Sequence, residues 1–457
     1  MEAEGIRRLI ADQRAHFATG AARTLGARKT ALTGLELWIT EHEAEISDAL
    51  AEDLGKSGFE AYATEIYMVL SEIRHARGHV RRWMAPRRVP TPIVHFPSAS
   101  RIYPDPFGVV LIMSPWNYPF QLTLAPLVAA LAAGNCAVIK PSAYSPATSR
   151  LIARMIGELF EPARVAVVCG GRAENQTLLD AAWDKICFTG SVAVGRTVME
   201  SASKHLTPVL LELGGKSPCL VDETADLKLA ARRIAWGKFL NSGQTCVAPD
   251  YLYVHASVKD ELVAGIARSI RTFYGDDPLT SASLSRMVNE KHFDRVCALM
   301  EGAHVLHGGS CDRATLRIEP TLIDGVSWES PVMGEEIFGP VLPIMSWTDI
   351  EEVACEISAR PHPLATYIFT RSKAREHALL ERLTFGGGCV NDTIVHLATN
   401  HLPFGGVGAS GMGAYHGKAG FDAFTHYKSV LKKSNLLDVP LRYPPYKDRN
   451  IALLRKL

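Results

Sequence analysis

The sequence predicts an α/β protein whose first half forms a doubly wound parallel sheet and whose second half forms another α/β unit. Short apolar runs alternate with amphipathic segments from residue 107 onward, and polar loops follow the apolar runs. The chain has 457 residues, which is too long for one ordinary core. With 47% apolar and 21% charged residues, its composition is that of a globular protein.

The elements follow in order along the chain. Residues 1 to about 85 show helical periodicity, with apolar positions three or four apart, and the proline-rich joint APRRVPTPIVHFP follows. Five apolar runs are then typical of buried strands: FGVVLIM, CAVIK, VAVVCG, KICFTG and PVLLELGG. Helical segments at 121–134, 147–160, 174–182 and 194–206 separate them. We expect a second alternation after Cys246, beginning with the strand YLYVH and the helix VKDELVAGIARSIRTF.

Charge and cysteine usage narrow the class of partner. Lysine plus arginine number 49 and aspartate plus glutamate 48, so net charge indicates neither nucleic acid nor an acidic membrane surface. The nine cysteines show no CxxC pair and no zinc-ligand spacing, which predicts no metal site and favours a reducing, cytoplasmic location. The N-terminus lacks the apolar core of a signal peptide, and the apolar stretch 122–134 contains Pro126 and is too short to span a bilayer. We therefore expect a small-molecule partner and no membrane anchor.

Ligands of a doubly wound sheet bind at the carboxyl ends of its strands, where SPWNYP, KPSAYSP, CGG and FTGSVAVG fall. The literal GxGxxG, GVGASG at 406–411, is rejected as a dinucleotide fingerprint because no parallel strand-helix-strand unit follows it and the required acidic residue about 20 positions further on is absent. FTGSVAVG is a better phosphate cradle, with Gly190, Ser191 and Gly195 at a strand-to-helix turn, although an ordinary turn explains it equally. Lys140 ends a strand and is either a solvated charge or a ligand of ribose or phosphate.

Three residues have the chemistry of acyl transfer. Cys246 lies among polar and turn-forming residues, which suits a reactive thiol better than a packing residue. Glu212 lies among apolar residues in LLELGG, so it is either a general base with a raised pKa or a buried glutamate with a structural partner. Asn117 in SPWNYP is either a turn former or, near a thiol, an oxyanion donor.

Together these motifs resemble the aldehyde dehydrogenase superfamily. PWNYP, FTGS, LELGGKSP, GQTC, EEIFGP and LPFGGVGASGMG appear in the family's order from roughly residue 50 to 445, and GQTCVAPDY and RYPPY are similar to its class 3 branch. The resemblance implies a Rossmann-like dinucleotide-binding domain (1–85 and 104–213), a catalytic thiol domain (214–425) and a small β extension for oligomerisation (86–103 and 426–445), in a homodimer. It also implies aldehyde oxidation with NAD or NADP, through a thiohemiacetal and a thioester that water hydrolyses. The implied roles are nucleophile for Cys246, general base for Glu212, oxyanion donor for Asn117, and cofactor binding for Trp116, Lys140, Gly190, Ser191, Gly195, Leu213, Glu336 and Phe338.

One position departs from the pattern of the NAD-preferring members. Where many of them have a glutamate three residues after the lysine, this chain has Ala143, which leaves NADP possible as well as NAD. Three other functions compete: a CoA-dependent acylating dehydrogenase, a thioesterase or esterase without a cofactor, and a binding protein with a dead site. The presence of Glu212 argues against the first, and the presence of Cys246, Glu212 and Asn117 together argues against the last. The aldehyde itself is left open among medium-chain aliphatic, aromatic and semialdehyde substrates.

Overall fold

The computed structural model describes residues 2–438, 440–446, 450, 451 and 455. Within these residues the first sheet has six strands in the order β17-β7-β6-β3-β4-β5, all parallel except β17, which runs antiparallel to β7. The strands are β3 Val109–Met113, β4 Cys136–Lys140, β5 Val165–Val167, β6 Lys185–Thr189, β7 Val209–Glu212 and β17 Gly411–Met412. The connecting helices are α6 Gln121–Ala133, α7 Pro146–Leu159, α8 Arg172–Asp180 and α9 Val192–Ser203.

The order of these strands creates a binding crevice. The chain builds β4 and β5 on one side of β3 and then crosses to build β6 and β7 on the other side. Such a reversal opens a crevice outside the carboxyl ends of the strands, where the loop after β3 and the loop after β6 meet. The loop after β3 contains SPWNYP, and β6 is followed by Gly190 and Ser191, which lead into α9.

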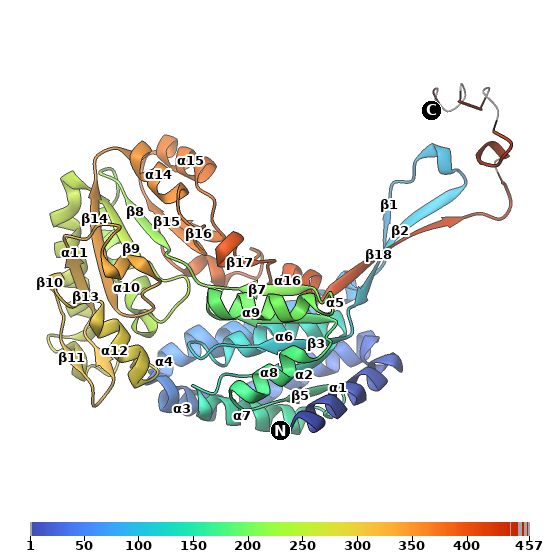
Figure 1. Cartoon of the computed structure of the whole chain (residues 1–457), viewed down its shortest axis with the longest axis horizontal. Coiled ribbons are helices and arrows are strands. Elements are labelled where there is room, and N and C mark those ends of the chain that lie inside the picture. The colour runs from blue at the N-terminus through green and yellow to red at the C-terminus, as the bar shows by residue number, and fades with distance from the viewer. Residues whose placement is uncertain (1, 439, 447–449, 452–454, 456–457) are drawn as a thin grey trace.

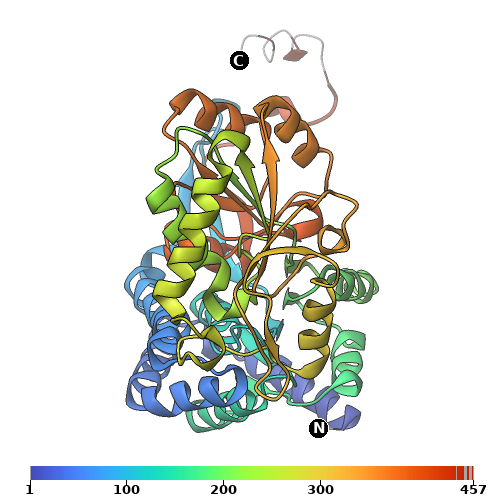
Figure 2. The ribbon, with the colours of Figure 1, turned by 90° about the vertical axis from the view of Figure 1, so that its left-hand side faces the viewer.

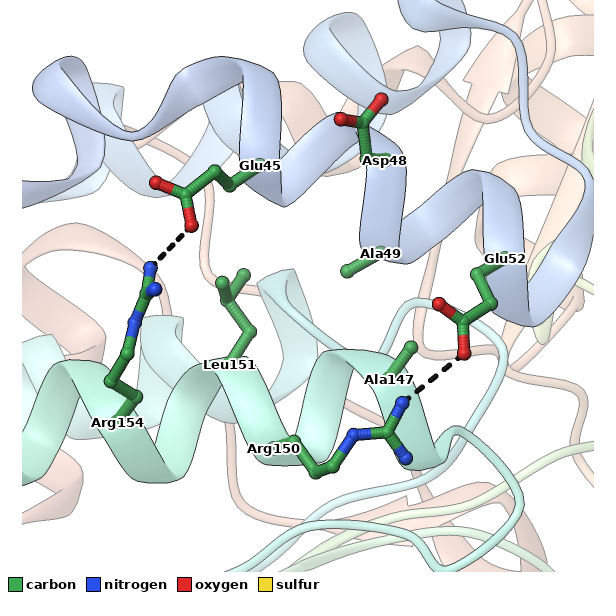
Figure 3. Close-up of a pocket in the computed structure, with 8 residues that line it drawn as sticks. All are labelled: Glu45, Asp48, Ala49, Glu52, Ala147, Arg150, Leu151 and Arg154. Carbon is green, nitrogen blue, oxygen red and sulfur yellow. Dashed lines mark hydrogen bonds and ion pairs between the residues drawn. The ribbon is translucent and has the colours of Figure 1, made fainter.

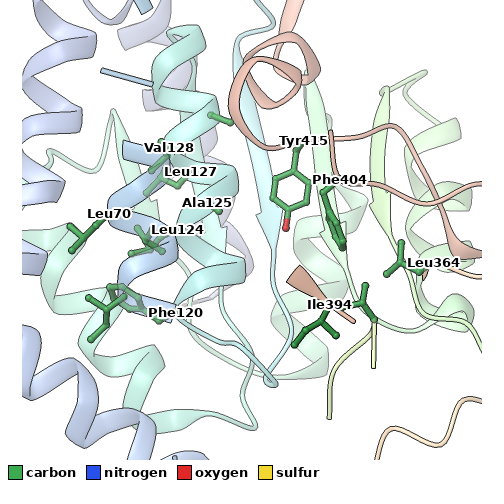
Figure 4. Packing of buried hydrophobic residues seen from close by; sticks show 14 of the residues in the cluster. Leu70, Phe120, Leu124, Ala125, Leu127, Val128, Leu364, Ile394, Phe404 and Tyr415 are labelled. Carbon is green, nitrogen blue, oxygen red and sulfur yellow. The ribbon is translucent and has the colours of Figure 1, made fainter. Parts of the chain in front are cut away.

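Helices cover this sheet and form the largest core. The N-terminal helices are α1 Ala3–Ala18, α2 Leu25–Glu41, α3 Glu43–Leu54, α4 Gly58–Ala61 and α5 Tyr67–Trp83. Every residue of α6 is buried because the helix packs against the sheet, α2, α5 and α16 Gly417–Ala423, which explains why its sequence is apolar from residue 124 onward. Figure 4 shows Leu124, Leu127 and Val128 on α6 in this core, with Phe404 and Tyr415 beside them.

Two charged pairs bridge α3 and α7 at the surface. Arg154 contacts Glu45 at 2.6 Å and Arg150 contacts Glu52 at 3.1 Å, and both pairs are exposed (Figure 3). Exposed pairs of this kind stabilise a fold by less than about 1 kcal/mol.

The second sheet in the described part of the chain has seven strands in the order β10-β13-β14-β9-β8-β15-β16, all parallel except β10. Its strands are β8 Pro218–Val221, β9 Tyr251–His255, β10 His304–His307, β13 Thr321–Asp324, β14 Val341–Trp347, β15 Ala365–Phe369 and β16 Gly387–Val390. Its helices are α10 Leu227–Phe239, α11 Lys259–Tyr274, α12 Glu290–Ala298, α13 Pro331–Gly334, α14 Ile350–Ser358 and α15 Lys373–Arg382, and a hairpin joins β11 Cys311–Asp312 to β12 Arg317–Ile318. In Figure 2 this unit stands above the blue N-terminal helices.

A three-stranded antiparallel sheet projects from the body of the molecule (Figure 1). It consists of β1 Arg87–Val89, β2 Ser98–Pro106 and β18 Thr425–Lys433. The bridging segment expected at 426–445 includes residue 439, which lies outside the described residues. None of the helices that the structure describes is long and apolar enough to cross a membrane.

The predicted fold class, a doubly wound sheet with a second α/β unit and a small β extension, is confirmed. The expectation that the second alternation begins after Cys246 was wrong, because β8 and α10 precede that residue. PCLV in β8 is a run of only four residues, too short to separate from a buried turn by periodicity. GVGASG forms a turn and the short antiparallel strand β17 beside β7, in agreement with its rejection as a dinucleotide fingerprint.

Candidate active site

Cys246 follows a tight turn between α10 and β9. Asn241, Ser242 and Gly243 have φ values of 53°, 51° and 70°, so three successive residues have left-handed backbone. Only glycine fits at the third position, since a Cβ there would clash with the carbonyl oxygen of Gly339. The Gln244 side chain then fixes the turn: its Nε2 donates to the carbonyl oxygens of Asn241 (3.1 Å) and Arg286 (3.0 Å). The polar residues before Cys246 are therefore buried structural groups that place a half-buried thiol.

The loop after β3 reaches this turn. Asn117 is buried, and its side-chain Nδ2 donates to the carbonyl oxygen of Gln244 at 2.9 Å. The Tyr118 hydroxyl lies 2.6 Å from Oγ1 of Thr245, so two consecutive residues of SPWNYP hold the two residues before Cys246. An amide nitrogen carries two hydrogens, and the bond to Gln244 uses one of them.

A buried ion pair, which sequence reasoning missed, supports this loop. Nζ of Lys56 lies 2.5 Å from Oε1 of Glu65, and neither side chain is exposed. Lys56 also donates to the carbonyl oxygen of Asn117 at 3.2 Å, and Oε2 of Glu65 accepts from the backbone N–H groups of Phe120 (2.8 Å) and Gln121 (3.1 Å). Both residues lie in a stretch whose periodicity is that of an ordinary amphipathic helix. Only their contacts with the loop after β3, which the sequence pattern does not show, distinguish them from surface charges.

Glu212 is the last residue of β7 and is buried. Neither carboxylate oxygen has a hydrogen-bond partner among the described residues, which leaves the alternative of a structural partner without support. Burial raises the pKa of Glu212 well above its usual value. The predicted desolvation and raised pKa are therefore confirmed.

Two carboxylates affect the pKa of the Cys246 thiol. Burial, together with the charges of Glu336 and Glu212, raises the pKa of the Cys246 thiol far above its ordinary value. The thiol is therefore protonated at neutral pH in this environment, and a nearby base has to accept its proton before it can act as a nucleophile.

The turn between β6 and α9 contains the predicted phosphate cradle. Ser191 caps α9, and its Oγ accepts from the backbone N–H of Val194 at 3.4 Å. Gly190 donates its backbone N–H to the carbonyl oxygen of Glu212 at 3.0 Å, which ties the turn to the general-base candidate. A Cβ at Gly195 would lie 2.6 Å from Cδ2 of Leu213, so this glycine brings α9 close to the end of β7.

Lys140 lies at the carboxyl end of β4, beside the end of β3. Its side chain is buried and its Nζ donates to the carbonyl oxygen of Pro141 at 2.8 Å, which contradicts the reading as a solvated terminal charge. Burial lowers the pKa of Lys140. The ammonium has three hydrogens, so donors are left for a further ligand.

Glu336 and Phe338 lie on the loop before β14. Gly214 leaves room for the Glu336 carboxylate, which a Cβ at that position would overlap. Phe338 has a φ of 48°, and its ring meets the edge of Trp116 with centroids 5.3 Å apart. The loop after β3 and the loop before β14 therefore meet across the two sheets.

An apolar cavity of about 150 Å³ opens at Cys246. None of the described residues that line it is Asp, Glu, Lys or Arg. Burial lowers the pKa of His416 to about 4, so this lining histidine is neutral at physiological pH. The wall is largely hydrophobic and includes Met68, Leu122, Trp236, Leu397, Phe404 and Tyr415.

Comparison with known proteins agrees with these features. The family model described as "Aldehyde dehydrogenase family" matches residues 1–430. The chain is 46% identical over 446 residues to 4,4'-diaponeurosporen-aldehyde dehydrogenase of Staphylococcus aureus, covering 97% of each chain. It is 43% identical over 446 residues to the dimeric, NADP-preferring aldehyde dehydrogenase of Canis lupus familiaris, covering 96% of this chain and 98% of the relative.

Comparison with solved structures agrees with the sequence comparisons. The substrate-bound state of Staphylococcus aureus AldH superimposes with a TM-score of 0.97 at 45% identity and covers 99% of each chain. The predicted resemblance is thereby confirmed, and the chain belongs to the aldehyde dehydrogenase family.

Proposed function

We propose that this enzyme oxidises an aldehyde to a carboxylic acid with reduction of NAD or NADP, through a thiohemiacetal and a thioester on Cys246. The observation that carries the proposal is a half-buried thiol, that of Cys246, on the wall of an apolar cavity, together with a buried, unpartnered carboxylate, that of Glu212, whose charge affects the pKa of the thiol. A thioesterase would use the same thiol but needs no dinucleotide, so cofactor dependence separates the two functions.

The residues divide the chemistry between them. The Cys246 thiol passes its proton to a water molecule and its Sγ adds to the aldehyde carbon. The second N–H of the Asn117 amide and the Cys246 backbone N–H donate to the resulting oxyanion. The dinucleotide, when bound, accepts the hydride. Glu212 then takes a proton from the water that attacks the thioester, and the acid leaves as the C–S bond breaks. The raised pKa of Glu212 suits this role, because it makes the carboxylate a stronger proton acceptor than an exposed glutamate.

The dinucleotide would bind in the crevice between the two sheets. The buried Lys140 ammonium has donors for a ribose or phosphate, and Ser191 and the N-terminus of α9 favour a pyrophosphate. Glu336 would hold the nicotinamide ribose, and Phe338 and Trp116 would flank the ring. The surface under the pyrophosphate would be formed by Gly190, Gly195 and Leu213.

NADP is proposed beside NAD because of Ala143, which is exposed just beyond β4. The side chain there carries no carboxylate that would repel a 2'-phosphate. The Canis relative, described as NADP-preferring, supports this reading.

An apolar aldehyde fits the cavity best. Its described lining offers no fixed charge to pair with the carboxylate of a semialdehyde. The Staphylococcus relative is named for a different kind of aldehyde from a semialdehyde, 4,4'-diaponeurosporen-aldehyde.

The other proposals concern the whole protein. The 1–85 and 104–213 segments would form the dinucleotide-binding domain, 214–425 the catalytic domain, and 86–103 with 426–445 the bridge to a second subunit in a homodimer. A cytoplasmic location fits the nine cysteines, all of which are free.

The experiment follows the absorbance of reduced nicotinamide with a panel of aliphatic, aromatic and carboxylated aldehydes, for the wild type and for Cys246→Ala. We expect turnover with NAD and NADP, highest for apolar aldehydes, and complete loss of aldehyde oxidation and ester hydrolysis in the variant while dinucleotide binding persists. Substantial turnover in pure Cys246→Ala would refute the assignment of the nucleophile. Turnover that requires CoA would identify the acylating enzyme instead.

A further inference from the structure

Two thiols outside the proposed catalytic residues lie next to each other. Sγ of Cys297, at the end of α12, lies 3.1 Å from Sγ of Cys311, which opens β11. Both are free; Cys311 is exposed and Cys297 is half-buried. A disulfide bond measures about 2.05 Å, so the sulfurs need to approach by only about 1 Å.

The fold holds the two thiols together. Arg313, in the β11–β12 hairpin that begins with Cys311, makes ion pairs with Glu290 (2.8 Å) and Asp294 on α12. These ion pairs therefore hold the hairpin against α12, the helix that carries Cys297.

The same helix supports the loop proposed to bind the nicotinamide end of the dinucleotide. Arg295 donates to the carbonyl oxygens of Ile337 (2.5 Å) and Glu336 (3.4 Å). The side chain of the next residue, Val296, packs against Gly339: a Cβ added to Gly339 would lie 2.7 Å from Cγ2 of Val296. One turn earlier, His292 lies 4.9 Å from Trp116, measured between ring centroids.

We propose that Cys297 and Cys311 form a reversible disulfide when a hydroperoxide reaches them, and that this bond weakens dinucleotide binding. The more exposed Cys311 attacks the peroxide: an S–O bond forms, the O–O bond breaks, and an alcohol or water leaves. Cys297 then attacks Sγ of Cys311, which forms the S–S bond, breaks the S–O bond and releases water. The two thiols lose two electrons, and the peroxide is reduced.

The expected weakening follows from the contacts of α12. Closing the disulfide pulls the C-terminal turn of α12 toward the hairpin. The loop at Glu336 is held from the other side, because the Ile337 N–H donates to Oδ1 of Asp250 at 2.9 Å. The loop therefore does not follow the helix freely, and the contacts of Arg295 with it are loosened.

This second part rests on the proposed dinucleotide site, so the experiment measures the disulfide and the binding separately. The full chain carrying Cys246→Ser, which keeps the catalytic thiol out of the reaction, is treated with hydrogen peroxide for hours, because burial raises the pKa of Cys311 and slows its attack. Peptide mass spectrometry should find Cys297 joined to Cys311, and dithiothreitol should separate them. The Kd for NADP, followed by protein fluorescence, should rise about fivefold on oxidation and return on reduction, as for two weakly coupled sites.

Matched variants decide the outcome. Cys311→Ser should abolish both the cross-link and the change in Kd, whereas Cys355→Ser, which removes another exposed cysteine, should change neither. If no Cys297–Cys311 peptide forms, or if it forms and the Kd does not change, the proposal is wrong. If the reduced protein does not bind a dinucleotide at all, the proposed function fails, and the cross-link still reports on the thiol pair.

Discussion

The carboxylate of Glu212 is buried at the end of β7, and no described residue donates a hydrogen bond to it. Burial raises its pKa, so this group stays protonated at a pH where an exposed glutamate would be ionised. Only the ionised form can take a proton from water. In the proposed mechanism, Glu212 activates the water that hydrolyses the thioester. Its pKa would therefore also set the pH below which turnover falls.

Replacing Glu212 by glutamine should slow deacylation more than hydride transfer, because an amide cannot accept the proton of water. We expect a rapid burst of reduced cofactor followed by slow turnover in stopped-flow measurements. Wild-type steady-state turnover should fall as the pH drops through the raised pKa of Glu212, and the variant should lose this dependence. Loss of the burst itself, with the dinucleotide still bound, would assign Glu212 a different role.

At Ala143, a glutamate should raise selectivity for NAD. The new carboxylate would accept hydrogen bonds from the ribose hydroxyls and repel a 2'-phosphate, each effect being on the order of 1 kcal/mol at this exposed position. The ratio of kcat/KM for NAD to that for NADP should rise roughly tenfold. A ratio that matches the wild type would show that residue 143 does not face the ribose, and Ala143→Gln serves as the uncharged control.

Residue by residue, the sequence predicts best where a local pattern carries the chemistry. The leucines on both sides of Glu212 predict that its carboxylate is buried, and the structure agrees. Lys140 was open between two readings because a strand end does not reveal what covers it. Lys56 and Glu65 were missed since they bond to the backbone of Asn117 and Phe120, more than 50 residues away.

At the scale of elements, the loop after β3 depends on the segment that joins α3 to α5. The Lys56–Glu65 pair is fully buried and bonds to the backbone of Asn117, Phe120 and Gln121. Removing one charge from such a pair leaves the other buried and unpaired. The position of the Asn117 amide is therefore coupled to an ion pair outside the site.

Glu65→Gln should lower the free energy of unfolding by about 3 kcal/mol and also reduce kcat, because the oxyanion donor loses its support. Glu52→Gln is the matched control: it removes one charge from the exposed pair with Arg150 (Figure 3) and should cost less than about 1 kcal/mol. Denaturant unfolding and steady-state kinetics on both variants measure the difference. Equal, small effects would mean that the buried pair does not brace the loop.

The prediction of strands succeeded where the apolar runs were long. The strands β3, β4 and β6 fall within the predicted runs. The second alternation of strands and helices was placed too late because β8 has only four residues and no alternation of polar and apolar positions. The pairing of β17 with β7 joins residues about 200 apart, which no local pattern encodes.

On the scale of the whole molecule, the three-stranded extension exposes large apolar side chains. Val430 and Leu431 on β18, and Ile93 on the connection between β1 and β2, are each at least 44% exposed. A projecting apolar surface of this kind is costly in water unless another surface covers it. This supports the proposal that the extension packs against a second copy of the chain.

Leu431→Glu should therefore shift the protein from dimer toward monomer, since a charge would be buried in the interface. Light scattering after gel filtration measures the mass. Leu206→Glu, at a leucine that is 90% exposed just after α9, is the control and should leave the mass unchanged. A wild type that is already monomeric, or a Leu431→Glu dimer as stable as the wild type, would remove the extension from the interface.

The central claim is that a thioester forms on Cys246 and that water activated by Glu212 cleaves it. Mass spectrometry of Glu212→Gln, quenched in acid after mixing with an apolar aldehyde and NADP, tests this claim most directly. We predict a mass increase equal to the acyl group, located on the peptide that contains Cys246 and absent when Cys246→Ala is added. Release of carboxylic acid with no acyl adduct on Cys246, or an adduct on another cysteine, would contradict the account.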